Sequence, residues 1–289
     1  MILVVGGTGL LGSRLVPDLA AAGERVRVFA RGFHPFPVDW PPPVERVEGD
    51  LGSPADCQRA VQGCVKVVFA ASGFGLPRHG DPRSVDRDGA IRLIRAAASA
   101  GVEHLVMMSM HGAASDGPIE FLRCKYEAEE ALKTSAMAWS IVRMGVLLEQ
   151  WIGVLSGPLD AKGKVMIFGT GIAPVTFTSL ADASAIVSRA LVDPALRERT
   201  LEWGSEVHTM RELAGALIAR AGHGTIQVTP PVMLRVMSLV ARPFSPFMAR
   251  MAGAAVWMDS GAMHFDIAPA RAEFPDIPVH GLDGALTGA

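Results

Sequence analysis

The stretch Met1-Ile-Leu-Val-Val-Gly-Gly-Thr-Gly-Leu-Leu-Gly12 decides the fold of this 289-residue chain. Five apolar residues, Met1–Val5, run into a glycine-rich turn, and an alanine- and leucine-rich stretch follows. This order is typical of a buried parallel strand, a tight turn and a helix whose N-terminus faces outward. Gly6 allows the turn, Gly9 lets the backbone approach a pyrophosphate, and Gly12 lets the helix pack closely on the strand. The N–H groups at the helix start then form an anion site, so the stretch predicts dinucleotide binding.

Length and composition fit one large domain, or a nucleotide-binding domain with a smaller lobe. Apolar residues make up 49% of the chain and charged residues 19%, which allows a sizeable core. The net charge of −2 and the lack of a basic run do not favour binding of nucleic acid or anionic membranes.

Cys57, Cys64 and Cys124 lack the spacing of zinc ligands or a redox pair, so we expect reduced thiols and no metal site. Because a strand begins at Met1 and no apolar run reaches the roughly 20 residues of a membrane span, we expect a cytoplasmic protein.

Strands and helices alternate through the first half of the chain, which predicts an α/β fold: a Rossmann-type, doubly wound parallel sheet with a small C-terminal substrate lobe. We expect a nucleotide-binding domain over 1–150 and the lobe over 151–289, with some later segments returning to the sheet. The proline-rich stretch 34–43 is predicted to be a surface loop. After the first strand, the predicted strands are 25–30, 44–47, 65–71, 104–109 and 139–143, and the predicted helices are 53–62, 84–100 and 119–135.

Residues just past the strands suggest which dinucleotide is bound. Arg31 stands where an acidic residue would bind the ribose hydroxyl of NAD, and a cation there suits the 2′-phosphate, so NADP(H) is preferred over NAD(H). The alternative is an ordinary solvated arginine. Asp50 and Leu51 follow the third strand and either meet the adenine edge or belong to the N-cap region of the next helix. Ala71 and Ser72 permit close approach of a ribose, although small residues suit any tight turn.

Several motifs together resemble the atypical short-chain dehydrogenases/reductases, and most of all their NmrA-like, NAD(P)H-binding branch. They are Gly6-Gly-Thr-Gly-Leu-Leu-Gly12, Gly49-Asp-Leu51, Asp86-Arg-Asp-Gly89, Val106-Met-Met-Ser109, Lys125-Tyr-Glu-Ala-Glu129, Ile141-Val-Arg143, and Pro174-Val-Thr-Phe177 with Asp182. The resemblance covers roughly residues 1–190. With the positions discussed above, it implies that the cofactor is held by Gly6, Thr8, Gly9, Leu10, Leu11, Gly12, Arg31, Asp50, Leu51, Ala71, Ser72 and Lys125.

One departure from the wider superfamily concerns its chemistry. That superfamily uses a Tyr-x-x-x-Lys pair with a serine, and extended members carry a glutamate four residues after the lysine. In this register Lys125 and Glu129 match, but Phe121 occupies the place of the tyrosine. Tyr126 does not replace it, because each residue turns a helical side chain by about 100°. The expected proton donor is therefore missing.

Three residues are candidates for the chemistry. The similar isoflavone-reductase-like enzymes imply that Lys125 itself acts, since a partly desolvated lysine can release a proton near neutrality. His111, just past the fifth strand, is a candidate acid or base. Ser109 occupies the serine-like position and is a candidate to hold a substrate oxygen. The alternatives are a solvated helix lysine, a turn histidine that meets only water, and a strand-end serine bonded to backbone.

The sequence thus favours an NADPH-dependent oxidoreductase acting on a small, largely apolar carbonyl, enone or imine compound. A non-catalytic NADP(H)-binding sensor or assembly protein, and a redox-neutral isomerase or cyclase that keeps its cofactor, are the alternatives. A small-molecule substrate is the expected partner, nucleic acid is not, and a homodimer stays open.

The methionine-rich segment 230–263 is interrupted by arginines and prolines. Its apolar spacing predicts two core or interface helices. A soft lid over an apolar substrate and a peripheral membrane contact are the alternatives.

Overall fold

The computed structural model of the chain describes residues 1–32, 40, 44–75 and 80–287. By compactness it divides into two units. Unit 1 comprises Met1–Arg143 and Ala183–Glu202, and unit 2 comprises Met144–Asp182 and Trp203–Ala289. The domain boundary expected at residue 150 stays a prediction, whereas the compact units change over at 143–144. Apart from Trp40, the loop predicted over 34–43 lies outside the described residues.

Unit 1 is built on a seven-stranded sheet, counted over the described residues, with the strand order β10-β6-β5-β4-β1-β2-β3. Strand β1 lies between β2 and β4, and all three are parallel, as are β2–β3 and β4–β5. The order reverses beside β1, which is the position where doubly wound folds bind nucleotides. The strands are β1 (Ile2–Val5), β2 (Val26–Ala30), β3 (Val44–Glu48), β4 (Lys66–Phe69), β5 (His104–Met110), β6 (Ala138–Met144) and β10 (Arg199–Trp203).

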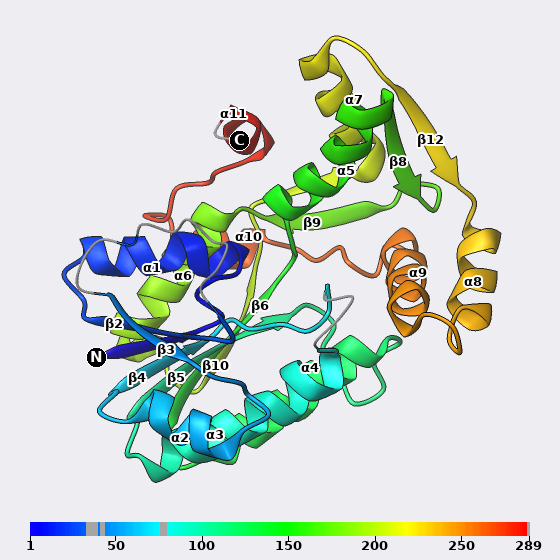
Figure 1. Cartoon of the computed structure of the whole chain (residues 1–289). Helices are drawn as coiled ribbons and strands as arrows, with labels where there is room; N and C mark the ends of the chain where they lie inside the picture. The colour runs from blue at the N-terminus through cyan, green and yellow to red at the C-terminus, as the bar shows by residue number, and fades with distance from the viewer. Residues whose placement is uncertain (33–39, 41–43, 76–79, 288–289) are drawn as a thin grey trace. The chain divides into compact units, whose positions relative to one another are not determined.

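Helices cover both faces of this sheet (Figure 1). Helices α1 and α6 lie on one face, and α2, α3 and α4 lie on the other. The core between the sheet and the second group contains fully buried residues such as Leu3, Leu93 and Leu105. The predicted doubly wound Rossmann-type sheet is therefore confirmed. The helical segments are α1 (Leu10–Ala21), α2 (Pro54–Val61), η1 (Pro82–Gly89), α3 (Ala90–Ser99), α4 (Glu120–Lys133), α6 (Leu180–Val192) and the short 3₁₀ turn η2 (Pro194–Leu196).

The helix predicted over 84–100 differs from the prediction in its first two turns. Residues Pro82–Gly89 wind as a π-helix, and the α-helix proper begins at Ala90. Asp81 caps the segment, because its carboxylate accepts from Ser84 N at 2.8 Å and Ser84 Oγ accepts from Asp81 N at 3.0 Å. π-Helical turns often occur at functional sites. This one carries the buried residue Asp86.

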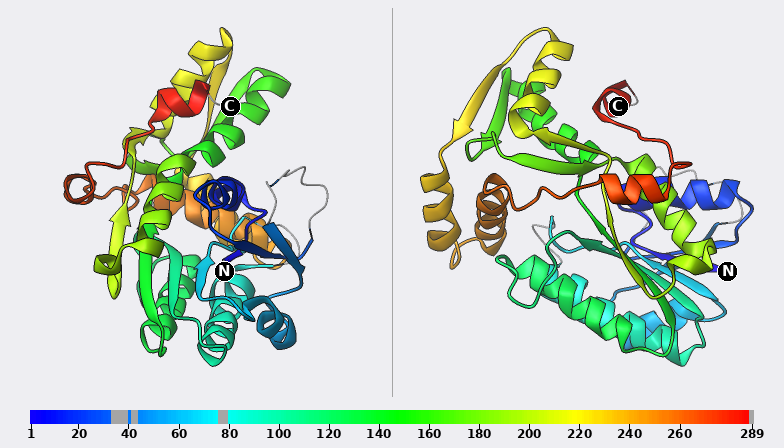
Figure 2. Two further views of the ribbon diagram at one scale, coloured as in Figure 1. Left: turned by 90° about the vertical axis from the view of Figure 1, so that its left-hand side faces the viewer. Right: turned by 180° about the vertical axis from the view of Figure 1, so that it is seen from behind.

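Unit 2 contains two small sheets. In the first, β9 (Pro174–Thr178) lies between the antiparallel β11 (Glu206–Thr209) and the parallel β7 (Val146–Leu147). In the second, β8 (Lys164–Phe168) pairs in parallel with β12 (Thr225–Thr229). Two views show β8 and β12 side by side, with α8 following β12 (Figures 1 and 2). The helices of unit 2 are α5 (Leu148–Lys162), α7 (Met210–Ala221), α8 (Pro231–Val240), α9 (Pro246–Asp259), α10 (Ala268–Glu273) and α11 (Leu282–Thr287).

The buried carboxylate of Asp182 holds the C-terminal segment within unit 2. It accepts hydrogen bonds from Ser205 Oγ at 2.7 Å and from His280 N at 3.0 Å, and it forms an ion pair with Arg271. The Arg271 guanidinium in turn lies 4.3 Å from the ring centroid of Trp203. This member of the sequence motif is therefore a structural residue.

Candidate functional site

The glycine turn has the shape that the sequence predicts. Gly6 has a positive φ of 84°, and Gly9 N donates to Gly6 O at 2.9 Å. Helix α1 then begins at Leu10 with no side-chain cap, so its first N–H groups are not covered by a capping side chain. A Cβ on Gly12 would lie 2.4 Å from both Gly6 O and Gly7 Cα, which no real side chain tolerates. The turn therefore requires glycine, and its role as the anion-binding end of a dinucleotide site stays a prediction.

Other predicted cofactor residues lie at the carboxyl edge of the same sheet. Arg31 follows β2 and is exposed, and Ser72 follows β4 and is also exposed. A Cβ on Gly6 would lie 2.8 Å from Ala71 Cα, so the turn and the end of β4 are in contact. Within the turn Thr8 is half-buried, Leu10 is exposed and Leu11 is buried in the core. The absence of a Cβ at the turn fits the close approach of a dinucleotide.

Asp50 follows β3 but does not cap the next helix. Its Oδ1 accepts from Gly52 N at 2.6 Å, which closes a local turn. The N-cap of α2 is Ser53, whose Oγ accepts from Asp56 N at 3.3 Å. Leu51 O accepts from Arg92 Nη1 at 2.5 Å, which fastens the loop to α3. Asp50 nevertheless belongs to the N-cap region of α2, because its carbonyl oxygen accepts from Ser53 N at 3.0 Å and its N–H donates to Asp56 Oδ2 at 3.0 Å. A contact of Asp50 with the adenine edge stays a prediction.

Lys125 is buried on α4 and does not behave as a solvated helix lysine. Its ammonium nitrogen lies 3.0 Å from Asp86 Oδ1 and donates to Met108 O at 3.0 Å. The other carboxylate oxygen of Asp86 accepts from Gly73 N at 2.8 Å. An ammonium group has three donors, so at least one remains for a cofactor or substrate oxygen. Sequence reasoning missed Asp86 as a site residue, although it opens the quoted Asp86–Gly89 motif.

Phe121 stands one helical turn before Lys125. Its side chain is buried, and its ring centroid lies 5.5 Å from the Lys125 ammonium nitrogen. The ring also contacts that of Phe74, with centroids 4.7 Å apart. Phe121 thus lies beside Lys125, as a tyrosine would in the superfamily pattern, but it provides a cation–π contact and no hydroxyl.

Ser109, at the end of β5, donates its hydroxyl proton to the buried Glu129. The distance from Ser109 Oγ to Glu129 Oε1 is 2.5 Å, and because a carboxylate only accepts, the serine is the donor. Arg143 binds the same carboxylate through two nitrogens, at 3.0 and 2.6 Å. Hydrogen bonding to Glu129 raises the pKa of Arg143, so this guanidinium stays charged. The serine is therefore oriented by a buried ion pair that sequence reasoning did not identify, although both partners occur in the quoted motifs.

His111 points toward the same network from the turn after β5. Its Nδ1 lies 2.8 Å from Glu202 Oε2, and Glu202 Oε1 lies 3.8 Å from Arg143 Nη1. His111 is half-buried, so the alternative of a turn histidine that meets only water does not hold. The ammonium group of Lys125 reaches from α4 to the last residues of β5, where it bonds the carbonyl of Met108 beside Ser109. His111 is directed to Glu202.

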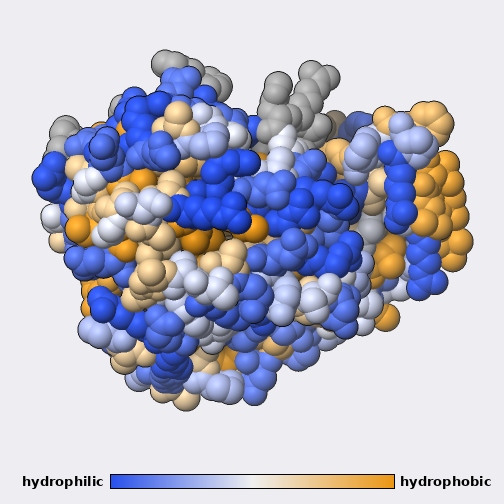
Figure 3. Space-filling model, turned by 90° about the horizontal axis from the view of Figure 1, so that it is seen from below, coloured by the Kyte–Doolittle hydropathy of each residue, from blue (hydrophilic) through white to orange (hydrophobic). Residues whose placement is uncertain are grey.

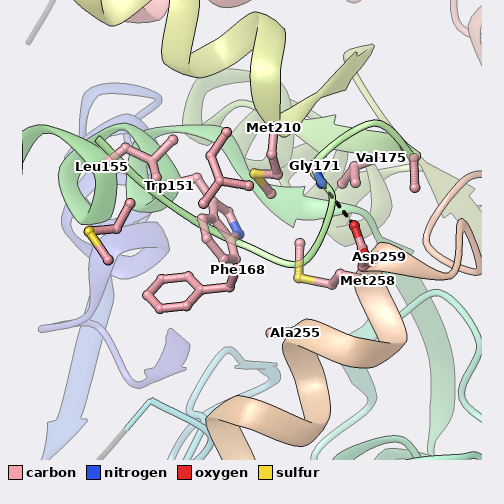
Figure 4. A pocket seen from close by; sticks show the side chains of 12 residues that line it. Trp151, Leu155, Phe168, Gly171, Val175, Met210, Ala255, Met258 and Asp259 are labelled. Atoms are coloured by element: carbon pink, nitrogen blue, oxygen red, sulfur yellow. Dashed lines mark hydrogen bonds between the residues drawn. The ribbon is translucent and has the colours of Figure 1, made fainter. Parts of the chain in front are cut away.

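Unit 2 has a small apolar pocket of its own, with a volume of about 20 Å³ (Figure 4). Its lining is almost wholly apolar: Trp151, Leu155, Met166, Ile167, Phe168, Gly171, Ala173, Val175, Met210, Ala255 and Met258, with Asp259 as the charged member. Asp259 accepts from Thr170 N at 2.8 Å and from Gly171 N at 2.9 Å, so its charge is compensated by the loop beside it.

Comparison with known proteins agrees with this geometry. A family profile described as NAD(P)H-binding matches residues 6–163. The NAD(P)H azoreductase of Xenophilus azovorans is 31% identical over 224 residues, which cover 77% of this chain and 74% of that protein. The photosystem II assembly factor Ycf39 of Synechocystis is 25% identical over 280 residues, which cover 94% of this chain and 85% of that protein. The NADPH complex of the quinone oxidoreductase QOR2 from Escherichia coli has a TM-score of 0.77 at 19% identity and covers 100% of this chain and 99% of that chain, which shows a common fold. The chain therefore belongs to the NAD(P)H-binding oxidoreductase family of NmrA-like, atypical short-chain dehydrogenases/reductases.

Proposed function

We propose that the protein is an NADPH-dependent reductase of small, largely apolar compounds that carry a conjugated carbonyl, enone or imine group. The observation that carries this proposal is the buried Lys125, held at the end of β5 by Asp86 and by Met108 O. A cation buried with its partners beside the carboxyl edge of a nucleotide-binding sheet is typical of a functional site. The activity named for the azoreductase relative supports reduction of a conjugated double bond.

NADPH supplies a hydride when it is bound, and the turn at Gly6–Gly12 would hold its pyrophosphate. The residues of the chain then have separate tasks. Lys125 has a donor left for an oxygen of the ribose or the substrate and is the first candidate to release a proton, since Phe121 has none to give. The hydroxyl proton of Ser109 is donated to Glu129, so the Ser109 oxygen can accept a hydrogen bond from a substrate. Ser109 donates to a substrate oxygen only if its hydroxyl turns away from Glu129.

Oxidation of NADPH by the purified protein tests the activity. The panel contains a quinone, an aromatic azo compound, an enone and a cyclic imine, and absorbance of the reduced nicotinamide is followed against a blank without substrate. We expect turnover of at least one compound, and a loss of about 100-fold in Lys125→Met. Calorimetry with NADPH and NADH is the companion measurement. Failure to bind either dinucleotide would overturn the whole proposal.

The preference for NADPH is tested at Arg31, the exposed residue that follows β2. Arg31→Ala is expected to weaken NADPH binding by roughly tenfold, the scale of one charge-assisted phosphate contact, and to leave NADH binding unchanged. Arg25 stands before the other end of the same strand, where it faces Glu45 at 3.7 Å, and Arg25→Ala is the matched control. Equal affinity of the wild-type protein for NADPH and NADH would refute the role of Arg31.

A second candidate, a non-catalytic NADP(H)-binding assembly protein, is favoured by Phe121. The ring in the tyrosine position and the pairing of Lys125 with Asp86 leave a cofactor site with little acid–base equipment. The name of the Synechocystis relative supports this class. Tight binding of NADPH, with no oxidation of NADPH by any compound of the panel, would favour this second candidate. Product formation without a net change in nicotinamide absorbance would instead indicate a redox-neutral isomerase or cyclase.

A further inference from the structure

Helix α8 of unit 2 carries a large apolar surface that the described chain leaves uncovered. Leu234 is the one buried residue of α8, and the helix packs against α9. The space-filling view shows apolar side chains gathered at the right-hand edge of the molecule, where α8 lies (Figure 3). The apolar residues of α8 and the following turn that are at least half exposed are Val232, Met233, Val236, Leu239, Val240 and Phe244.

These side chains form one face rather than a scatter. Val232, Val236, Leu239 and Val240 recur at the spacing that places residues on a common side of a helix. Phe244, in the turn to α9, is 86% exposed, which is extreme for a phenylalanine in an ordered segment. An apolar face of this kind marks an interaction site.

Positive charges lie beside this apolar face. The segment 230–263 contains Arg235, Arg242 and Arg250, one acidic residue, Asp259, and no Glu or Lys, so its net charge is +2 in a chain whose net charge is −2. Arg235 and Arg242 are exposed and flank the apolar face. Arginines at the flank of an apolar helix face keep their heads in the polar layer while their stems cover apolar surface. The excess of positive charge in this segment favours an anionic partner surface.

We propose that α8 and the turn to α9, residues 231–248, bind the surface of an anionic lipid bilayer. A second copy of the chain is a poorer occupant, because it would bring the same three arginines against this patch and the like charges would repel. The helix lies on the bilayer and does not enter it as a span, since no helix within the described residues is long and apolar enough to cross a membrane.

Flotation with lipid vesicles tests the proposal. The full-length protein is mixed with vesicles of phosphatidylcholine alone, or with about three parts phosphatidylcholine to one part phosphatidylglycerol, at low and at high salt. We expect binding to the anionic vesicles at low salt, weaker binding at high salt, and little binding to phosphatidylcholine. Equal binding to both vesicle types, or no binding to either, would overturn the proposal.

Variants separate the apolar from the electrostatic contribution. Phe244→Asp is expected to reduce anionic-vesicle binding by at least tenfold, and Arg235→Gln or Arg242→Gln by roughly fivefold each. Val192→Asp, at an apolar position 60% exposed at the end of α6, is the matched control and should bind like the wild type. Calorimetric NADPH binding checks that each variant is folded. A concentration-dependent dimer that Phe244→Asp dissociates, without flotation of the wild type, would assign the patch to a second copy and overturn the lipid proposal.

Discussion

The ammonium group of Lys125 and the carboxylate of Asp86 form an ion pair at 3.0 Å in which both side chains are buried. The pair joins the middle of α4 to the π-helical segment η1. Two buried charges compensate each other, so neither side chain is stable in place without the other. The residue that the sequence assigns to the cofactor is thus also part of the framework.

Breaking this pair is expected to lower the free energy of unfolding by about 3–5 kcal/mol, because an uncompensated charge stays buried. The variants are Lys125→Met and Asp86→Asn, measured by urea denaturation together with the double variant. The coupling free energy between the two substitutions should exceed about 1 kcal/mol. Lys133→Met on the same helix is the control, since Lys133 pairs with Glu130 at the surface and should cost less than about 1 kcal/mol. Additive single effects would contradict the pairing.

Phe121→Tyr is expected to restore a proton donor one turn from Lys125. Turnover of the best panel substrate should rise at least tenfold, within the range of about 10²–10⁴ that general acid catalysis contributes, and should acquire a pH dependence. Tyr126→Phe, which removes the only tyrosine of the chain, is the matched control and should not change turnover. An unchanged rate in Phe121→Tyr would mean that proton donation from this position does not limit the reaction.

Gly12→Ala is expected to abolish NADPH binding, because the new methyl group would lie 2.4 Å from the carbonyl oxygen of Gly6. The clash is with backbone atoms of Gly6 and Gly7, so the turn must open to accept the methyl group. Gly215→Ala, in the exposed part of α7, meets nothing within 4 Å and should stabilise the protein by about 0.5–1 kcal/mol. Calorimetry and thermal unfolding of both variants make the comparison. Wild-type affinity in Gly12→Ala would show that the turn does not hold the dinucleotide.

His104 is expected to give the fold an acid sensitivity. Burial, followed by the nearby cations Arg197 and Lys66, lowers the pKa of His104 to about 4. Its Nε2 donates to Ser140 Oγ at 2.9 Å, since that hydroxyl is itself a donor to Leu196 O. Nδ1 has no partner among the described residues and therefore carries no proton.

The unfolded chain gains a proton on His104 below about pH 6.5, whereas the folded chain does so only near pH 4. The free energy of unfolding is therefore highest above about pH 6.5 and falls by about 3 kcal/mol as the pH drops toward about 4. Urea denaturation across this window measures the slope. His104→Gln keeps a donor to Ser140 and has no titrating group, so its slope should be flatter. An equal slope in both proteins would contradict the assignment.

The local part of the fold could be predicted from the sequence because its determinants are contiguous. The strand β1, the glycine turn and α1 are encoded within the first 21 residues, and the structure places them as predicted. The switch from π- to α-helix after Gly89 could not be predicted in this way, because the apolar spacing of the segment shows only that it is helical.

The candidate site could be predicted only in part, because its partners are far apart in the chain. Lys125 and Ser109 stand out by their places in a motif. Their partners are acidic residues on other elements, Asp86 and Glu129, and nothing local identifies which carboxylate meets which donor. His111 likewise meets Glu202, which lies in β10. Tertiary pairing, not the spacing of residue types, decides these contacts.

Strand β10 is synthesised long after β6, although the two strands are neighbours at the edge of the sheet of unit 1. While the ribosome passes from Met144 to Arg199, which takes about 3–11 s at the usual rates of synthesis, β6 has no neighbour on that side. An unpaired edge of this kind is a template for pairing with another chain. The order of the strands therefore exposes the edge of β6 to pairing with other chains during this part of synthesis. A chaperone that binds the nascent chain matters most in this interval.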